Sequence, residues 1–170
     1  MKNVDLVLVN DKDRIVGYKE KFETHKLPVS LHRAISVVIL DPTGNKMMLQ
    51  KRTKIKPTWP LFWSNACCTH PYREEDYLES ATRRIREEMG FDVALRELFR
   101  FIYQTEYDDI WGENEYDVIF EGVYQGSVNP NPEEAAEWKW IPINELLLEI
   151  KQNPDVYTPW FKVILERKYQ

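Results

Sequence analysis

Imidazole and carboxylate side chains are the first residues of this sequence that could do chemistry together. The chain has three histidines: His25 and His32 flank a loop-like stretch, and His70 follows two cysteines. Two acidic residues come much later as Glu113-Asn114-Glu115, and an extended strand would put both carboxylates on one face. Mixed imidazole and carboxylate ligands suit a hard or borderline divalent ion such as Mn²⁺, Mg²⁺ or Zn²⁺. Spacing alone leaves a metal site and ordinary polar side chains equally open.

A second charged group stands at the end of a segment with helical periodicity. Glu87 and Glu88 would end that helix, where carboxylate oxygens can hold Mg²⁺. Arg83 and Arg84 lie one turn earlier and can pair with carboxylates or with phosphate. The alternative is a solvated, salt-bridged helix face, which is what charged helix residues usually form.

Cys67 and Cys68 are the only thiols of the chain. Adjacent cysteines rarely bridge one another, so the sequence contains no disulfide framework. A reducing cytoplasm is the simplest expected location. A thiol can transfer protons, but its commonest role is that of a small buried hydrophobe. For Cys67 we favour the role of a small buried hydrophobe.

Bulk properties narrow the range of partners. The net charge is −5 and the pI is about 5.3, which argues against nucleic acid as the main partner but not against a small anion held by a local basic cluster. No apolar run is long enough for a transmembrane helix, and residues 1–10 lack the apolar region of a signal peptide. The length of 170 residues predicts one domain, 1–170.

The elements that must position these side chains are predicted from periodicity and turn signals. Strands are expected over 4–9, 14–18, 34–40, 46–51, 97–106, 115–124 and 137–141. The clearest helix is 77–89, where Gly90 is placed to stop it; two more are expected over 144–150, with Pro142 at the first turn, and 159–168. Strands dominate the middle of the chain, so the predicted class is α+β: mixed or antiparallel sheets flanked by helices.

The segment from Thr69 to Phe91 resembles the Nudix box, a loop–helix–loop that binds a divalent metal and a diphosphate. The matching residues are Thr69, Glu75, Arg83 and the run Glu87-Glu88-Met89-Gly90-Phe91. Two departures matter. Nudix hydrolases have a glutamate where this chain has Arg84, and their box usually opens with glycine where Thr69 stands. The resemblance implies a retained Nudix-like scaffold with weakened pyrophosphate hydrolysis.

Three motifs together resemble the type I isopentenyl-diphosphate isomerases over roughly residues 4–165. They are His25…His32, the stretch Trp63–Pro71, which includes Asn65, Cys68 and His70, and Glu113-Asn114-Glu115. This resemblance implies Mg²⁺ or Mn²⁺ as cofactor, with Zn²⁺ possible at the first site. The implied ligands of a first metal are His25, His32, His70, Glu113 and Glu115. A second metal, held with the diphosphate, would use Glu88.

Isomerising an unactivated alkene requires a proton delivered to one carbon and another removed nearby. The tertiary carbocation between these steps must be shielded from water, and an aromatic face can stabilise it. The resemblance implies Cys68 and Glu115 as the proton-transfer pair, Tyr103 as a hydrogen-bonding partner and Trp160 as the aromatic face. It further implies four basic residues near the diphosphate: Lys21, Arg52, Lys56 and Arg84.

The expected activity is the interconversion of isopentenyl and dimethylallyl diphosphate in isoprenoid biosynthesis. The expected partner is this small isoprenoid diphosphate, with no nucleic acid and no membrane, and the sequence does not reveal an oligomeric state. A Nudix hydrolase acting on a nucleoside-diphosphate compound is the main alternative, and Arg84 and the thiol–histidine motif speak against it. The third candidate function is that of a catalytically silent Nudix-like binding or sensing module. The presence of Cys68 and Glu115 speaks against it, but only weakly.

Overall fold

Nine strands join in one sheet in the computed structural model, which describes residues 5–169. The strands are β1 (Asp5–Val9), β2 (Ile15–Glu20), β3 (His32–Leu40), β4 (Lys46–Arg52), β5 (Trp63–Ser64), β6 (Cys67–Thr69), β7 (Leu95–Glu106), β8 (Gly112–Val123) and β9 (Ala135–Pro142). The helices are α1 (Lys21–His25), α2 (Tyr77–Met89), α3 (Ile143–Gln152), the 3₁₀ turn η1 (Pro154–Val156) and α4 (Pro159–Tyr169).

The predicted α+β class and most predicted elements are confirmed. Each of the seven expected strands coincides with a strand of the structure to within about three residues, although Val4, the first residue of the expected first strand, lies outside the described residues. The expected helices over 77–89, 144–150 and 159–168 correspond to α2, α3 and α4. The short helix α1 and the short strands β5 and β6 were not predicted, because two to five residues are too few to show a period.

Strand β3 lies at the centre of the sheet and pairs with four others. It runs parallel to β8, from the pair His32–Glu115 to the pair Leu40–Val123, and antiparallel to β1, β4 and β6. The sheet is therefore mixed. A strand covered on both faces carries a nearly continuous apolar run, which is why residues 34–40 show no alternation of apolar and polar residues.

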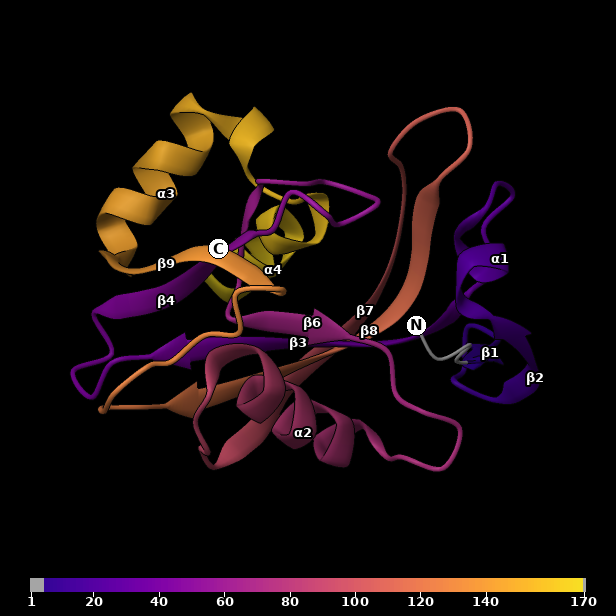
Figure 1. Cartoon of the computed structure of the whole chain (residues 1–170), viewed down its shortest axis with the longest axis horizontal. Helices are drawn as coiled ribbons and strands as arrows, with labels where there is room; N and C mark the ends of the chain where they lie inside the picture. Colours follow the sequence, from indigo (N-terminus) through magenta and orange to yellow (C-terminus); the bar gives the residue numbers. More distant parts are fainter. Residues whose placement is uncertain (1–4, 170) are drawn as a thin grey trace.

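Helix α2 covers one face of this sheet and α3 and α4 lie on the other (Figure 1), and an apolar core lies on each face. One packs against α2 and includes Ile35 and Val37 of β3 with Ile85 of α2. The other packs under α3 and α4 and includes Val38 with Phe161. Because side chains alternate along a strand, the even-numbered residues of β3 face the side of α4, whereas the odd-numbered residues face α2.

Helix α2 has well-defined ends. Asp76 caps its first turn in a capping box with Glu79, and the helix stops at Gly90, which adopts a left-handed φ of 78°. A Cβ at Gly90 would lie 2.3 Å from the carbonyl oxygen of Asn129, so the next loop can approach the end of α2 only because this residue is glycine. Leu78, in the first turn of α2, is 45% exposed and lies outside the core.

The first two strands and α1 form a unit at one end of the sheet (Figure 1). The end of α1 is fixed to the loop before β8, where Leu27 N–H donates to the carbonyl of Ile110 at 2.9 Å. This contact brings a segment from the start of the chain against the β7–β8 hairpin. Among residues 5–169, none of the helices combines the length and the apolar composition that a bilayer crossing requires.

Candidate active site

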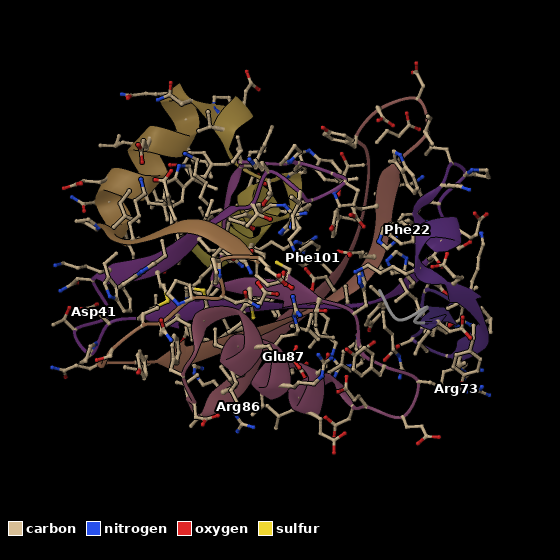
Figure 2. The ribbon with its side chains drawn as sticks, viewed as in Figure 1. Phe22, Asp41, Arg73, Arg86, Glu87 and Phe101 are labelled. Carbon is tan, nitrogen blue, oxygen red and sulfur yellow. The ribbon has the colours of Figure 1, made fainter. Side chains whose placement is uncertain are left out.

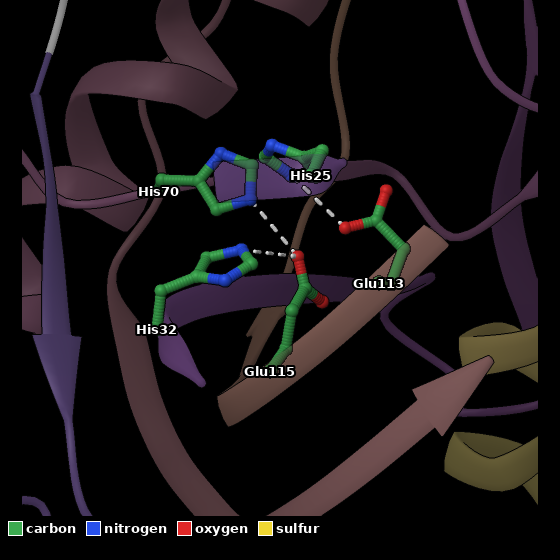
Figure 3. Close-up of side chains that lie close together, drawn as sticks. All are labelled: His25, His32, His70, Glu113 and Glu115. Atoms are coloured by element: carbon green, nitrogen blue, oxygen red, sulfur yellow. Dashed lines mark hydrogen bonds and ion pairs between the residues drawn. The ribbon is translucent and has the colours of Figure 1, made fainter. Parts of the chain in front are cut away.

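The imidazole rings of the three histidines meet at one place, although they come from three separate segments (Figure 3). His25 ends α1, His32 begins β3 and His70 follows β6. Their ring centroids lie 4.8, 5.0 and 4.9 Å apart in pairs. Together with Glu113 and Glu115 of β8, they offer potential ligand atoms that all lie within 4.8 Å of one another. The structure thus brings together every residue predicted to hold the first metal.

Sheet register explains how Glu115 reaches the centre of this cluster. The parallel pairing of β3 with β8 places Glu115 beside His32, and the antiparallel pairing of β7 with β8 places it opposite Tyr103. Directly opposite residues in a sheet present their side chains on the same face. Glu113 lies two residues earlier on β8 and therefore faces the same way. Glu113-Asn114-Glu115 is extended, which is the condition under which both carboxylates lie on one face.

Backbone carbonyls set the orientation of two histidine rings. His25 Nδ1 donates to the carbonyl of Lys21 at 2.6 Å, and His32 Nδ1 donates to that of Ser30 at 2.8 Å. With the proton on Nδ1, the lone pair of a neutral ring lies on Nε2, the nitrogen that faces the cluster. His25 Nε2 lies 3.0 Å from Glu113 Oε2, whereas the buried Nε2 of His32 has no hydrogen-bond partner among residues 5–169.

The donor set fits a divalent cation. Burial, followed by the charges of neighbouring histidines, lowers the pKa of both His32 and His70 well below the usual value, so these rings are neutral as ligands must be. Burial also opposes the charge on His25, but Glu113 outweighs it and raises the pKa of His25. An unpartnered Nε2 beside two carboxylates is the arrangement that a cation would complete.

Glu115 has several partners in the cluster. Its Oε1 lies 2.9 Å from His70 Nε2 and 3.8 Å from His32 Nε2, and its Oε2 accepts a hydrogen bond from the Tyr103 hydroxyl. Burial raises the pKa of Glu115, against the hydrogen bond from Tyr103, which lowers it. Burial and the charge of Glu115 raise the pKa of Tyr103, so the phenol stays protonated and its O–H donates the hydrogen bond to Glu115. The carboxyl group is thus held in one orientation with a raised affinity for a proton.

The two adjacent cysteines point to opposite faces of β6. Cys67 is fully buried in the core beside α2, whereas Cys68 is half-buried and lines a cleft on the other face. Burial, followed by the charge of Asp117, raises the pKa of Cys68 to about 12, so its sulfur carries a proton at neutral pH. The alternation of side chains along a strand therefore gives the two thiols different surroundings.

A cleft of about 120 Å³ opens above these groups. Its walls include most of the predicted site residues: Lys21, His25, Arg52, Lys56, Cys68, His70, Arg84, Tyr103, Glu113, Glu115 and Trp160. His32 lies beneath it and Glu88 borders a smaller adjoining cavity. Phe22, which belongs to α1 (Figure 2), and Trp111 also line the cleft, and neither was singled out from the sequence.

The indole of Trp160 closes the opposite side of the cleft. Trp160 lies in the first turn of α4, and Thr158 lies just before that helix. The backbone N–H of Thr158 donates to the carbonyl of Trp63 at 3.0 Å, which ties the start of α4 to β5. The ring is 4% exposed, and the Arg52 guanidinium lies 5.3 Å from its centroid. Arg52 also donates to the carbonyls of Trp59 and Thr58, at 3.1 and 2.9 Å. A cation thus already sits over this aromatic face.

The four basic residues do line one cleft, but acidic residues already pair with two of them. Lys56 forms an ion pair with Glu134, and Arg84 contacts the same carboxylate at 3.1 Å. Lys21 is exposed overall, but desolvation of its ammonium group, followed by the charges of Lys56 and Arg84, lowers its pKa. Glu134 lies in the irregular segment before β9, where no sequence pattern singled it out.

Glu88 lies apart from the histidine cluster. Its Oε1 accepts from Arg84 Nε at 2.8 Å and its Oε2 accepts from Gln50 Nε2 at 2.7 Å. The neighbouring Glu87 stays on the outer face of α2, where it pairs with Arg83 (Figure 2). Only one of the two helix-ending carboxylates therefore faces the interior, as alternation around a helix requires.

Comparison with known proteins places these features in a family. The NUDIX domain family matches residues 30–161. The chain is similar to Isopentenyl-diphosphate Delta-isomerase 2 of Aromatoleum aromaticum, with 38% identity over 95% of this chain and 85% of that protein. It is similar in the same way to the Isopentenyl-diphosphate Delta-isomerase of Serratia proteamaculans, with 37% identity over 95% of this chain and 89% of the other.

Solved structures share the fold at much lower sequence similarity. A crystal structure of a Deinococcus radiodurans protein superposes with a TM-score of 0.80 over 98% of this chain and 99% of the other, at 16% identity. Similarity at that level establishes the fold alone.

Proposed function

The chain belongs to the Nudix family and, within it, to the isopentenyl-diphosphate Delta-isomerases, and from this we propose how it works. The enzyme interconverts isopentenyl diphosphate and dimethylallyl diphosphate in isoprenoid biosynthesis. The observation that carries the proposal is the composition of one cleft: the protonated thiol of Cys68 and the buried carboxyl of Glu115 face the same space as the Trp160 indole.

Cys68 and Glu115 form the proton-transfer pair. One adds a proton to the terminal carbon of the double bond, and the other removes a proton from the carbon on the far side of the resulting cation. The acid starts protonated and the base starts deprotonated; the raised pKa values let the acid keep its proton until transfer and make the base a stronger proton acceptor. Tyr103 keeps the Glu115 carboxyl in position through its hydrogen bond.

The intermediate is a tertiary carbocation, and the cleft protects it from water. Trp160 presents an aromatic face, and its ring lies 5.3 Å from that of Trp59 and 6.4 Å from that of Tyr103. Aromatic faces attract cations, and bound substrate must keep water away from this side of the cleft, since water would trap the ion as an alcohol.

Cations at the cleft would anchor the diphosphate. Lys21, Arg52, Lys56 and Arg84 supply the charge, and Glu88 would hold a divalent ion bound together with the diphosphate. The cluster of His25, His32, His70, Glu113 and Glu115 would hold a separate divalent ion, which when bound supplies positive charge beside Glu115. Carboxylate and phosphate oxygens favour Mg²⁺ or Mn²⁺. The three imidazoles of the histidine cluster also suit Zn²⁺.

A free thiol at position 68 fits a reducing compartment, so we place the enzyme in the cytoplasm. Its partner is the small isoprenoid diphosphate. The activity is tested by incubating the protein with Mg²⁺ and isopentenyl diphosphate and following the product by ¹H and ³¹P NMR. Dimethylallyl diphosphate should form with both phosphates retained. Release of phosphate without movement of the double bond would instead favour a hydrolase, and no turnover would favour a binding module.

Arg84→Glu should weaken binding of the diphosphate. It removes a cation from the cleft and puts a carboxylate beside Glu88 and Glu134. A charged hydrogen bond is typically worth about 1.5–3 kcal/mol, so KM for isopentenyl diphosphate should rise roughly tenfold or more. The free energy of unfolding should also fall, because the buried Glu88 loses its cation.

The control for this prediction is Arg83→Glu, which makes the same charge change one residue earlier. Arg83 pairs with Glu75 and Glu87 and is not part of the cleft wall. Its KM should stay close to that of the unmodified enzyme in the same steady-state assay. An equal rise of KM in both variants would show that net charge matters and that Arg84 is no anchor.

A further inference from the structure

Asn65 lies behind the Cys68 thiol, away from the main cleft, and is completely buried. Its side-chain amide nitrogen donates to the carbonyl of Val37 at 3.1 Å and to that of Cys67 at 2.8 Å. The side-chain oxygen of Asn65 faces the Cys68 sulfur at 3.2 Å and the Ser64 hydroxyl at 3.0 Å. The reversed amide would put this oxygen against two carbonyl oxygens, so its orientation is fixed.

The proton positions around Ser64 follow from this orientation. The Asn65 side-chain oxygen can only accept, so the Ser64 hydroxyl donates to it. The indole Nε1–H of Trp160 can only donate, and it lies 3.1 Å from Ser64 Oγ. Thr158 Oγ1 lies 2.9 Å from the same oxygen and must therefore act as a donor too. One chain of hydrogen bonds thus runs from Trp160 through Ser64 to Asn65.

The thiol of Cys68 is the other donor to the Asn65 side-chain oxygen. On its far side the sulfur lies 3.4 Å from Ser36 Oγ, which itself donates to Asp117 Oδ2 at 2.8 Å. The sulfur is therefore held between two buried polar groups that are each fixed by further hydrogen bonds. The Ser36 hydroxyl proton goes to Asp117, and the thiol proton goes to the Asn65 side-chain oxygen, so Asn65 is the group that orients the thiol.

We propose that Asn65 and Ser64 are positioning residues that fix the Cys68 sulfur and the Trp160 indole relative to one another. The inference deepens the proposed function and rests on it. The proton-transfer thiol and the cation-stabilising ring come from distant parts of the chain, β6 and α4, and this buried chain of hydrogen bonds joins them through Ser64 and Asn65. Displacement of a reacting group by about 1 Å can cost about 10²-fold in rate. A connection that holds the thiol and the indole in place would therefore raise the rate.

Ser64→Ala tests the connection. It leaves the basic residues of the cleft in place, so KM for isopentenyl diphosphate should not change. Loss of the hydroxyl removes the acceptor of the Trp160 indole N–H and one donor to the Asn65 side-chain oxygen. We therefore expect kcat to fall about tenfold. Ser64→Thr keeps a hydroxyl and should recover most of the lost kcat. A variant with unchanged kcat, or one in which KM rises in step with a fall in kcat, would overturn the proposal.

A second measurement needs no activity. The Trp160 indole N–H resonance in a ¹H–¹⁵N spectrum, identified by its loss in Trp160→Phe, should shift in Ser64→Ala and return in Ser64→Thr. An unshifted resonance would overturn the proposal even if the enzyme were an isomerase. Failure of the proposed function would instead show as an inactive unmodified protein with the resonance shift intact.

A double-mutant cycle completes the test. Trp160→Phe and Ser64→Ala remove opposite ends of one hydrogen bond, so their effects on kcat should be less than multiplicative in the double variant. Fully multiplicative effects would contradict a shared connection. If Ser64→Ala does not fold, Ser64→Cys replaces the hydroxyl by a weaker hydrogen-bonding group and serves in the same cycle.

Discussion

Cys68→Ala should abolish measurable isomerisation. The variant loses the thiol that holds a proton in the cleft, and positioned acid–base groups contribute roughly 10²–10⁴-fold to rate. Because the basic residues that bind the diphosphate are unchanged, the substrate should still bind, and the loss should appear in kcat. The measurement is the steady-state conversion of isopentenyl to dimethylallyl diphosphate, together with a binding titration of the inactive variant.

Cys67→Ala provides the matched control, since it removes the adjacent thiol from the opposite face of β6. That side chain is fully buried beside α2, so its loss should lower the free energy of unfolding while most of the activity remains. Equal loss of activity in both variants would sink the assignment of Cys68 as the proton-transfer thiol.

Replacing all three cluster histidines by asparagine should remove the bound metal and the activity together. The imidazoles of His25, His32 and His70 supply most of the donors that surround one point. Loss even of an outer-shell partner typically costs about 10–100-fold in metal affinity, and loss of the ligands themselves should cost more. Elemental analysis of purified protein gives the metal content directly, and each single variant should show a smaller fall in both quantities.

A matched change outside the cluster separates this effect from general damage. Glu97→Gln alters an exposed residue that pairs with Arg100, and its metal content and activity should match those of the unmodified protein. Circular dichroism of the triple variant checks that the fold is intact. Full metal occupancy in a folded triple variant would refute the site.

The sequence predicted the parts of the site that depend on local periodicity. The spacing of Glu113 and Glu115 places both on one strand face, whereas the split between a core thiol at Cys67 and a cleft thiol at Cys68 depends on β6, a strand that was not predicted. The ends of α2 follow from its capping residues and Gly90. Each of these features is set within a few residues, where sequence patterns are most informative.

The remaining features depend on contacts between distant segments. The parallel pairing that puts His32 beside Glu115 joins strands far apart in the chain, and no local pattern fixes that register. Glu134, which pairs with Lys56 and Arg84, lies in an irregular segment without a period. The connection from Asn65 to Trp160 passes through residues that look like ordinary polar side chains until the fold places them together.

Incubation with isopentenyl diphosphate and Mg²⁺ in D₂O tests the central claim most directly. If exchangeable protons on Cys68 and Glu115 are added and removed, the dimethylallyl diphosphate that forms should carry deuterium at the carbon that becomes a methyl group, with the diphosphate intact. The product is followed by ²H and ³¹P NMR, with Cys68→Ala as the inactive control. Dimethylallyl diphosphate that forms without deuterium, or cleavage of the diphosphate without movement of the double bond, would contradict the account.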